Sequence, residues 1–121
     1  MLLNSLYKYQ VLEKKEESLL ATITLNKDHE IYKGHFPGNP VTPGACQVQI
    51  IKEVLSDILK KEISLNKAKE IKFINPLLPV ENNTSTLTIN YQPDDNLTLN
   101  VQAKISDEEK VFLKLKGTYN G

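Results

Sequence analysis

The feature that most constrains this chain is a stiff loop at residues 34–44, which runs directly into a segment with helical patterning. The loop contains three prolines and three glycines. Proline locks φ and glycine permits positive φ, so this composition predicts an unusual backbone path held in one conformation. Such rigidity is expected where a backbone must be held close to another group. One of the two histidines of the chain, His35, lies in this loop.

The segment that follows the loop is predicted to be a helix. From Ala45 to about Lys61, apolar residues recur three and four positions apart, and Pro43 with Gly44 marks the start. The first backbone N–H groups of a helix have no intrahelical acceptor, and the positive end of the helix dipole lies behind them. His35 and a free N–H at the helix start can therefore face one bound carbonyl group.

Composition limits the class of protein. The chain of 121 residues suffices for one ordinary domain, and its 40% hydrophobic and 25% charged residues are typical of a soluble globular protein. The formal net charge is zero, which gives no global indication of nucleic-acid or membrane binding. Every basic residue is a lysine, which disfavours a site built on bidentate capture of phosphate. The single cysteine and the absence of a leader-like start predict a cytoplasmic protein.

Alternating apolar and polar residues predict a set of strands around the helix. The alternation covers residues 18–25, 70–74, 84–91, 97–105 and 111–119. The segment 2–12 fits a strand or a short helix equally well, residues 13–17 read as a charged turn, and residues 63–67 read as a connection. Short turns between strands favour antiparallel pairing, so we expect one α+β domain, residues 1–121, with a single helix packed on a curled sheet.

Two motifs carry a resemblance to a known family. Residues 35–44 read His-Phe-Pro-Gly-Asn-Pro-Val-Thr-Pro-Gly, and residues 73–81 read Phe-Ile-Asn-Pro-Leu-Leu-Pro-Val-Glu, with Val80 and Glu81 where the family pattern has Gly and Asp. The chain thereby resembles the hotdog-fold 3-hydroxyacyl-[acyl-carrier-protein] dehydratases. The resemblance implies a sheet wrapped around one long central helix. It also implies conversion of 3-hydroxyacyl thioesters to trans-2-enoyl thioesters in fatty acid or related polyene or polyketide biosynthesis.

The resemblance assigns roles to particular residues. His35 is expected to be the base, with its ring oriented by the Val41 carbonyl, and the Gly44 backbone N–H is expected to donate to the thioester oxygen. Phe36, Val41, Pro43 and Phe73 are expected to contact substrate. No metal and no cofactor is expected, and the sequence shows neither a cluster of ligands at metal spacing nor a phosphate-binding glycine motif.

The chain departs from the family at the helix carboxylate. That position holds Gln49, and Glu53 stands one turn later, where the family pattern has Gln. An amide has no proton to lose at neutral pH, so Gln49 cannot be the general acid. Either His35 returns the proton itself while Gln49 positions the hydroxyl or a water, or Glu53 is the acid through a bridging water. In the third alternative the protein binds acyl thioesters without dehydrating them, or hydrolyses them.

Each of these residues also has a reading without function. Glu53 beside Lys52 can be a solvated helix glutamate, and Gln49 a polar helix residue without a role. Cys46 falls in the first helical turn, where a thiol pKa can be depressed, but we expect it to be a packed small residue. His29 belongs to no motif and is expected at the surface.

Partners follow from the same resemblance. Hotdog dehydratases are dimers whose sheets join edge to edge, and some assemble as trimers of dimers. The histidine of one subunit faces the helix residue of the other, so we expect a homodimer with composite sites. The expected partner is acyl carrier protein, which is acidic, and Lys67, Lys69 and Lys72 are candidates for contacting it. We expect no nucleic acid and no membrane as partners.

Overall fold

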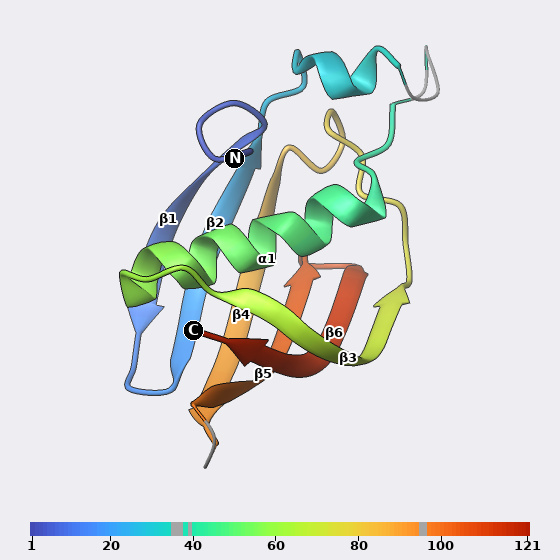
Figure 1. The fold of residues 1–121 in the computed structure, drawn as a ribbon. Coiled ribbons are helices and arrows are strands. Elements are labelled where there is room, and N and C mark those ends of the chain that lie inside the picture. The colour runs from blue at the N-terminus through green and yellow to red at the C-terminus, as the bar shows by residue number, and fades with distance from the viewer. Residues whose placement is uncertain (35–37, 39, 95–96) are drawn as a thin grey trace.

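The computed structural model describes residues 1–34, 38, 40–94 and 97–121. Its elements are, in chain order, β1 (Tyr7–Lys14), β2 (Ser18–Leu25), the 3-10 helix η1 (Glu30–Tyr32), α1 (Gly44–Leu59), β3 (Ser64–Phe73), β4 (Thr84–Pro93), β5 (Thr98–Ser106) and β6 (Val111–Asn120). The strands form one antiparallel sheet in the order β1-β2-β4-β5-β6-β3. Figure 1 shows α1 lying across one face of this sheet, which curls so that β1 and β3 flank the helix.

The core lies between α1 and the sheet. The helix buries one stripe, and the strands bury the residues that alternate with exposed polar ones, as the sequence pattern predicts. Fully buried members include Ile50, Ile51, Val54 and Leu55 from α1 and Leu87, Ile89, Ile105, Leu113 and Leu115 from the strands. The expected α+β arrangement of one long helix followed by strands is confirmed, with two strands before the helix and four after it.

Two local predictions need correction. Residues 64–67 belong to β3 and are not a connection, and the charged turn expected at residues 13–17 begins only after Lys14, the last residue of β1. For segment 2–12, where a strand and a short helix were both left open, the structure has the strand β1 from Tyr7 onward. The start of β3 escapes pattern analysis because Asn66 and Lys69 are bulged and have no register partner on β6, which breaks the alternation. The strand also lies at the edge of the sheet, where both faces are largely exposed.

The connection before the loop contains η1, which the pattern did not predict. His29 precedes it, and its Nδ1 accepts a hydrogen bond from the backbone N–H of Ile31 at 3.0 Å. His29 is therefore a partly exposed capping residue, which agrees with the expected place at the surface and adds a hydrogen bond that the sequence pattern did not indicate. Within the described part of the chain, no helix is long and apolar enough to cross a membrane.

Candidate active site

The loop of the first motif is anchored at both ends. The hydroxyls of Tyr32 and Thr42 are hydrogen-bonded at 2.9 Å, which ties the residues on the two sides of the loop together. The Thr42 backbone N–H donates to the Leu77 carbonyl at 2.8 Å, and the Gln47 side-chain amide donates to the Thr42 carbonyl at 3.1 Å. Thr42 is only 1% exposed. Its contacts fix where the loop enters α1, while His35 and Phe36 themselves lie outside the described residues.

The helix begins where the loop ends. Pro43 occupies the N-cap without a side-chain hydrogen bond, and its carbonyl accepts from the N–H groups of Cys46 and Gln47. The N–H of Gly44 makes no hydrogen bond to any described residue. It is therefore one of the free donors expected at a helix start, with the positive end of the helix dipole behind it.

The second motif packs against this helix start. A Cβ built on Gly44 would lie 2.6 Å from Cζ of Phe73, so the aromatic ring covers the position that a side chain would take. Phe73 is nevertheless 54% exposed. Val41 and Pro43, which precede Gly44 in the sequence, are half-buried. Two motifs almost thirty residues apart thus meet at Gly44, and the Phe73 ring keeps an open side.

Gln49 and Glu53 form a second pair farther along α1. The Gln49 side-chain nitrogen donates to Oε2 of Glu53 at 2.8 Å. Gln49 is half-buried, and Glu53 is only 5% exposed, so the reading of Glu53 as a solvated glutamate is wrong. Lys52 does not pair with it and instead contacts Glu62 at 3.2 Å.

The Glu53 carboxylate is held by the N-terminal segment. Besides Gln49, it accepts from the backbone N–H groups of Leu2 and Leu3, each at 2.8 Å, and from the Tyr7 hydroxyl at 3.0 Å. We call these four groups the Glu53 donor set. Burial alone raises the pKa of the Glu53 carboxyl, but the donor set outweighs it, and the pKa lies below its ordinary value. Burial, followed by the Glu53 charge, raises the pKa of Tyr7, which keeps its proton for this bond.

Within one protomer, the contact between Gly44 and Phe73 lies apart from the hydrogen bond between Gln49 and Glu53. Gly44 and Gln49 are separated by five residues of helix, which is about 7.5 Å of rise, and they project in different directions around the axis. Phe73 packs against Gly44, whereas the N-terminal segment holds Glu53, the hydrogen-bond partner of Gln49. Both Gly44 and Gln49 keep open sides, so a second surface has room to complete each of them.

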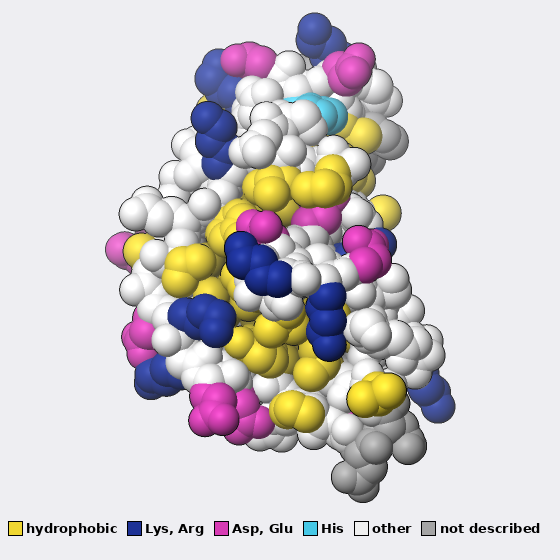
Figure 2. All heavy atoms as spheres, turned by 60° about the vertical axis from the view of Figure 1, so that its left-hand side comes forward, with side chains coloured by type: hydrophobic (Ala, Val, Ile, Leu, Met, Phe, Trp, Pro, Cys, Tyr) yellow, Lys and Arg dark blue, Asp and Glu magenta, His cyan; other side chains and the backbone are white. Residues whose placement is uncertain are grey.

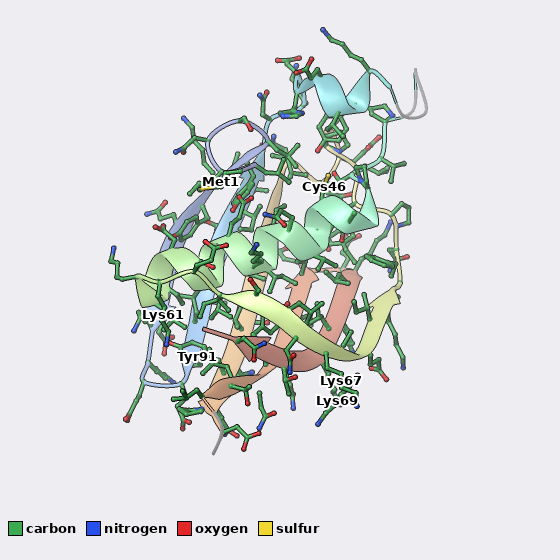
Figure 3. The ribbon with its side chains drawn as sticks, viewed as in Figure 1. Met1, Cys46, Lys61, Lys67, Lys69 and Tyr91 are labelled. Carbon is green, nitrogen blue, oxygen red and sulfur yellow. The ribbon has the colours of Figure 1, made fainter. Side chains whose placement is uncertain are left out.

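Lysines gather on the outer face of the sheet. Lys72 on β3, Lys114 on β6 and Lys104 on β5 are direct cross-strand neighbours, and we call them the lysine row. They line a hollow of about 510 Å³ together with Lys116. Lys72 lies 3.7 Å from Glu70, but Lys104 and Lys114 have no ion pair among the described residues. Figure 3 shows Lys67 and Lys69 projecting from β3 on the side away from α1.

Sequence reasoning found the loop, the helix start and the exchanged acid and amide, but it missed several residues of the site. Tyr7 and Tyr32 belong to neither motif, Thr42 lies in the first motif but had no assigned role, and the Leu2 and Leu3 donors are backbone groups. The lysine row becomes visible only from the strand register. Cys46 is half-buried against the core, and burial raises the pKa of its thiol, which agrees with a packed residue rather than a nucleophile.

The chain resembles known proteins in sequence. A family model described as ApeI-like, ApeI dehydratase, matches residues 11–116. The 3-hydroxyacyl-[acyl-carrier-protein] dehydratase FabZ of Lactobacillus helveticus is 29% identical over 99 residues, which cover 76% of this chain and 67% of the relative. The FabZ of Rickettsia bellii is 26% identical over 99 residues, which cover 82% of this chain and 61% of the relative. The chain thus spans about two thirds of the length of these two relatives.

Solved structures share the fold. The dehydratase heterocomplex ApeI:P from Xenorhabdus doucetiae contains a chain with a TM-score of 0.70 and 20% identity, which covers 94% of this chain and 99% of that one. A thioesterase mutant from Staphylococcus aureus has a TM-score of 0.64 and 13% identity, with 93% and 91% coverage. The sheet curled around one helix is therefore the hotdog fold that the motifs implied. Because the family model spans most of the residues, this chain belongs to the ApeI-like dehydratase family.

Proposed function

We propose that this protein dehydrates 3-hydroxyacyl thioesters of acyl carrier protein to trans-2-enoyl thioesters, in fatty acid or related polyene or polyketide biosynthesis. The observation that carries the proposal is the N–H of Gly44 at the start of α1, which has no hydrogen-bond acceptor among the described residues, together with the Phe73 ring packed against the same residue. A thioester oxygen at this N–H accepts a hydrogen bond that strengthens as negative charge develops on the oxygen. Membership of the dehydratase family supports the reaction class.

The proposed reaction uses one titrating side chain. His35 removes the proton from the carbon beside the thioester carbonyl, and the electron pair left behind forms an enolate that the Gly44 N–H stabilises. The enolate electrons then form the carbon–carbon double bond as the C3–O bond breaks. His35 returns its proton to the departing hydroxyl, which leaves as water. Gln49 holds this hydroxyl by hydrogen bonding, and Phe36, Val41, Pro43 and Phe73 contact the acyl thioester.

Glu53 is the less favoured acid. A general acid must present a proton to the leaving group, whereas the donor set keeps the Glu53 carboxyl ionised and occupies its oxygens. The same occupation weakens the second candidate function, thioester hydrolysis, in which a free carboxylate activates water. Binding of acyl thioesters without chemistry is the remaining alternative, and it is favoured by the amide at position 49.

The proposed assembly is a homodimer in which the sheets join along β3. This edge strand carries exposed apolar side chains, Leu65 and Phe73, and Ile74 follows it. Val48, Ile58 and Leu59 of α1 are also only half-buried. Figure 2 brings forward the left-hand side of Figure 1, where apolar side chains lie in the middle of the face with charged side chains among and around them. In such a dimer, His35 of one protomer meets Gln49 of the other, and trimers of dimers are a further possible assembly.

A relative suggests one alternative assembly. The similar structure from Xenorhabdus doucetiae is a heterocomplex, so a second hotdog chain with a carboxylate at the position of Gln49 is the alternative partner. Such a chain supplies the acid that this one lacks. The remaining expectations, a single domain over residues 1–121 and a place in the cytoplasm, complete the proposal.

The lysine row is the proposed contact for acyl carrier protein. Like charges on directly opposite strand positions repel one another, so an acidic partner that covers them removes a local cost. Replacing Lys104 and Lys114 by Glu is expected to weaken carrier binding at low salt by about tenfold or more. Replacing Lys8 and Lys60, which lie elsewhere, is the control. Equal carrier affinity of both double variants at low salt contradicts this docking site.

Turnover of a 3-hydroxyacyl carrier-protein substrate tests the reaction. We expect the wild type to form the enoyl product and His35→Ala to lose it, while His29→Ala, which removes the other histidine, retains it. Gly44→Ala is expected to fold normally, because alanine favours a helix and the Phe73 ring can move, but to lose turnover because the methyl group enters the site. An inactive wild type together with an active Gln49→Glu variant would identify a scaffold that has lost its acid.

A further inference from the structure

Glu53 is a buried carboxylate that no cation neutralises within the described residues. Its partners are the four neutral groups of the donor set, namely two backbone N–H groups, a phenol and an amide. Burying a charge is costly unless hydrogen bonds compensate it, so the arrangement has a definite cost in desolvation. Its one contact with the proposed chemistry is Gln49.

A carboxylate fixes the orientation of a neighbouring amide. An ionised carboxylate only accepts hydrogen bonds, so the Gln49 side chain must turn its nitrogen toward Glu53. The carbonyl oxygen, Oε1, then faces away from Glu53, on the open side of the residue. A neutral amide at position 53 can donate or accept, and it would allow both orientations of Gln49. The charge at Glu53 therefore determines which atom of Gln49 is presented.

We propose that Glu53 is a positioning residue that presents Oε1 of Gln49 as the acceptor for the substrate's 3-hydroxyl hydrogen; this rests on the proposed dehydration. With its hydrogen bound to Oε1, the hydroxyl keeps its lone pairs free to receive the proton from His35. The opposite orientation points an N–H at the same oxygen and occupies a lone pair. The oriented amide thus suits a site in which one histidine moves the proton both ways.

The N-terminal segment is part of this device. The N–H groups of Leu2 and Leu3 and the Tyr7 hydroxyl keep Glu53 ionised, and Tyr9 reaches Asp57 one turn further along α1. The charged groups that neighbour Glu53 include Asp57 on the same helix, Lys52, which is paired with Glu62, and the amino group of Met1, the residue before the Leu2 donor. None of them is hydrogen-bonded to the carboxylate. Contacts some fifty residues apart in sequence thereby set the orientation of one side chain.

A double-mutant cycle in kcat separates positioning from a structural role. The variants are Glu53→Gln, Gln49→Met and the combination, measured with a 3-hydroxyacyl carrier-protein substrate. We expect Glu53→Gln to lower kcat about tenfold or more with little change in KM. In the Gln49→Met background the same change is expected to have almost no further effect on kcat, because Glu53 acts through Gln49. Glu62→Gln, which removes an exposed carboxylate that pairs with Lys52 and lies outside the donor set, is the control and is expected to retain kcat.

The results either support or overturn the inference. A Glu53→Gln variant with wild-type kcat overturns it, and so does an equal loss of kcat in both backgrounds, which marks a structural effect. A scalar coupling across the hydrogen bond between Nε2 of Gln49 and the carboxylate carbon of Glu53 tests the orientation without turnover. If the coupling is present but the wild type is inactive, the proposed function fails and the positioning role fails with it, although the orientation stands. Absence of the coupling overturns the inference directly.

Discussion

At the scale of single residues, the site depends on buried polar groups that find partners. Tyr32 and Thr42 are both buried, and their hydroxyls satisfy each other across the ends of the motif loop. Neither residue has a role in the proposed reaction, but their hydrogen bond holds the chain where the loop enters α1. A loss at either position therefore affects stability first and the position of His35 second.

Thr42→Val is expected to destabilise the protein by about 1–3 kcal/mol, because it keeps the side-chain shape but leaves the buried Tyr32 hydroxyl without its partner. The double variant Thr42→Val with Tyr32→Phe removes both hydroxyls and is expected to recover most of that loss. Urea denaturation of the two single variants and the double variant measures the coupling. Additive losses in the double variant would contradict a direct interaction between the hydroxyls.

At the scale of elements, β1 is attached to α1 through paired phenols and carboxylates. Tyr7 and Tyr9 lie on the same face of the strand, and Glu53 and Asp57 lie one turn apart on the helix, so both pairs form together. The first pair is buried and the second is at the surface. The Glu53 pair also holds the Leu2 and Leu3 backbone, so one carboxylate links three segments.

This link predicts a pH-dependent contribution to stability. The donor set holds the pKa of Glu53 below its unfolded value, so its contribution to stability is fully present at pH values above the unfolded pKa. The contribution is lost as pH falls through the folded pKa. Glu53→Gln is therefore expected to cost about 1–3 kcal/mol at neutral pH and less in acid. Denaturant titrations of wild type and variant across pH measure this. If the loss of stability caused by Glu53→Gln stays constant or grows as the pH falls, the proposed pH-dependent link is contradicted.

The contact between β6 and β3 depends on one glycine. A Cβ at Gly117 would lie 2.7 Å from the Lys67 carbonyl oxygen and 3.3 Å from Cα of Ala68, both of which are backbone atoms. Gly117→Ala is expected to cost about 1–3 kcal/mol, because the bulged edge strand must shift. Gly34→Ala is the matched control, since nothing lies within 4 Å of a Cβ at that position. Similar unfolding temperatures for the two variants would show that β3 moves without cost.

At the scale of the whole molecule, the proposed site is incomplete in a single protomer. Gly44 and Gln49 each have an open side, β3 is an unpaired edge within the described residues, and apolar side chains are exposed along it. In the proposed homodimer, a second copy joined along β3 would cover these groups and bring its own loop toward Gln49. The proposed chemistry and the proposed assembly therefore depend on each other.

The double variant Leu65→Lys with Ile74→Lys is expected to sediment as a monomer and to lose turnover, because it places charges on the proposed seam. Leu97→Lys is the control, because Leu97 is 90% exposed and lies before β5, away from β3. Analytical ultracentrifugation gives the mass of each. A wild type that sediments as a monomer contradicts the homodimer, and it directs the search toward a second hotdog chain.

The sequence by itself determined the helix, most of the strands, the stiff loop and the exchange of acid and amide at Gln49 and Glu53. These features depend on local periodicity, on the backbone limits of proline and glycine, and on motif spacing. Most of the fold was accordingly predicted, apart from β1, for which a strand and a helix were both left open, η1, and the start of β3, where a bulged edge strand lacks a clear alternation.

Only the tertiary structure decided what surrounds the site residues. A helical pattern indicates which face is buried, but not that Leu2, 51 residues away, donates to Glu53. In the same way, the ring of Phe73 over Gly44 and the lysine row follow from strand order and register. Such contacts depend on how the whole chain closes around its core, because groups distant in sequence become neighbours only then. The charge at Glu53 is visible in the sequence, and its burial among neutral donors is a property of the fold.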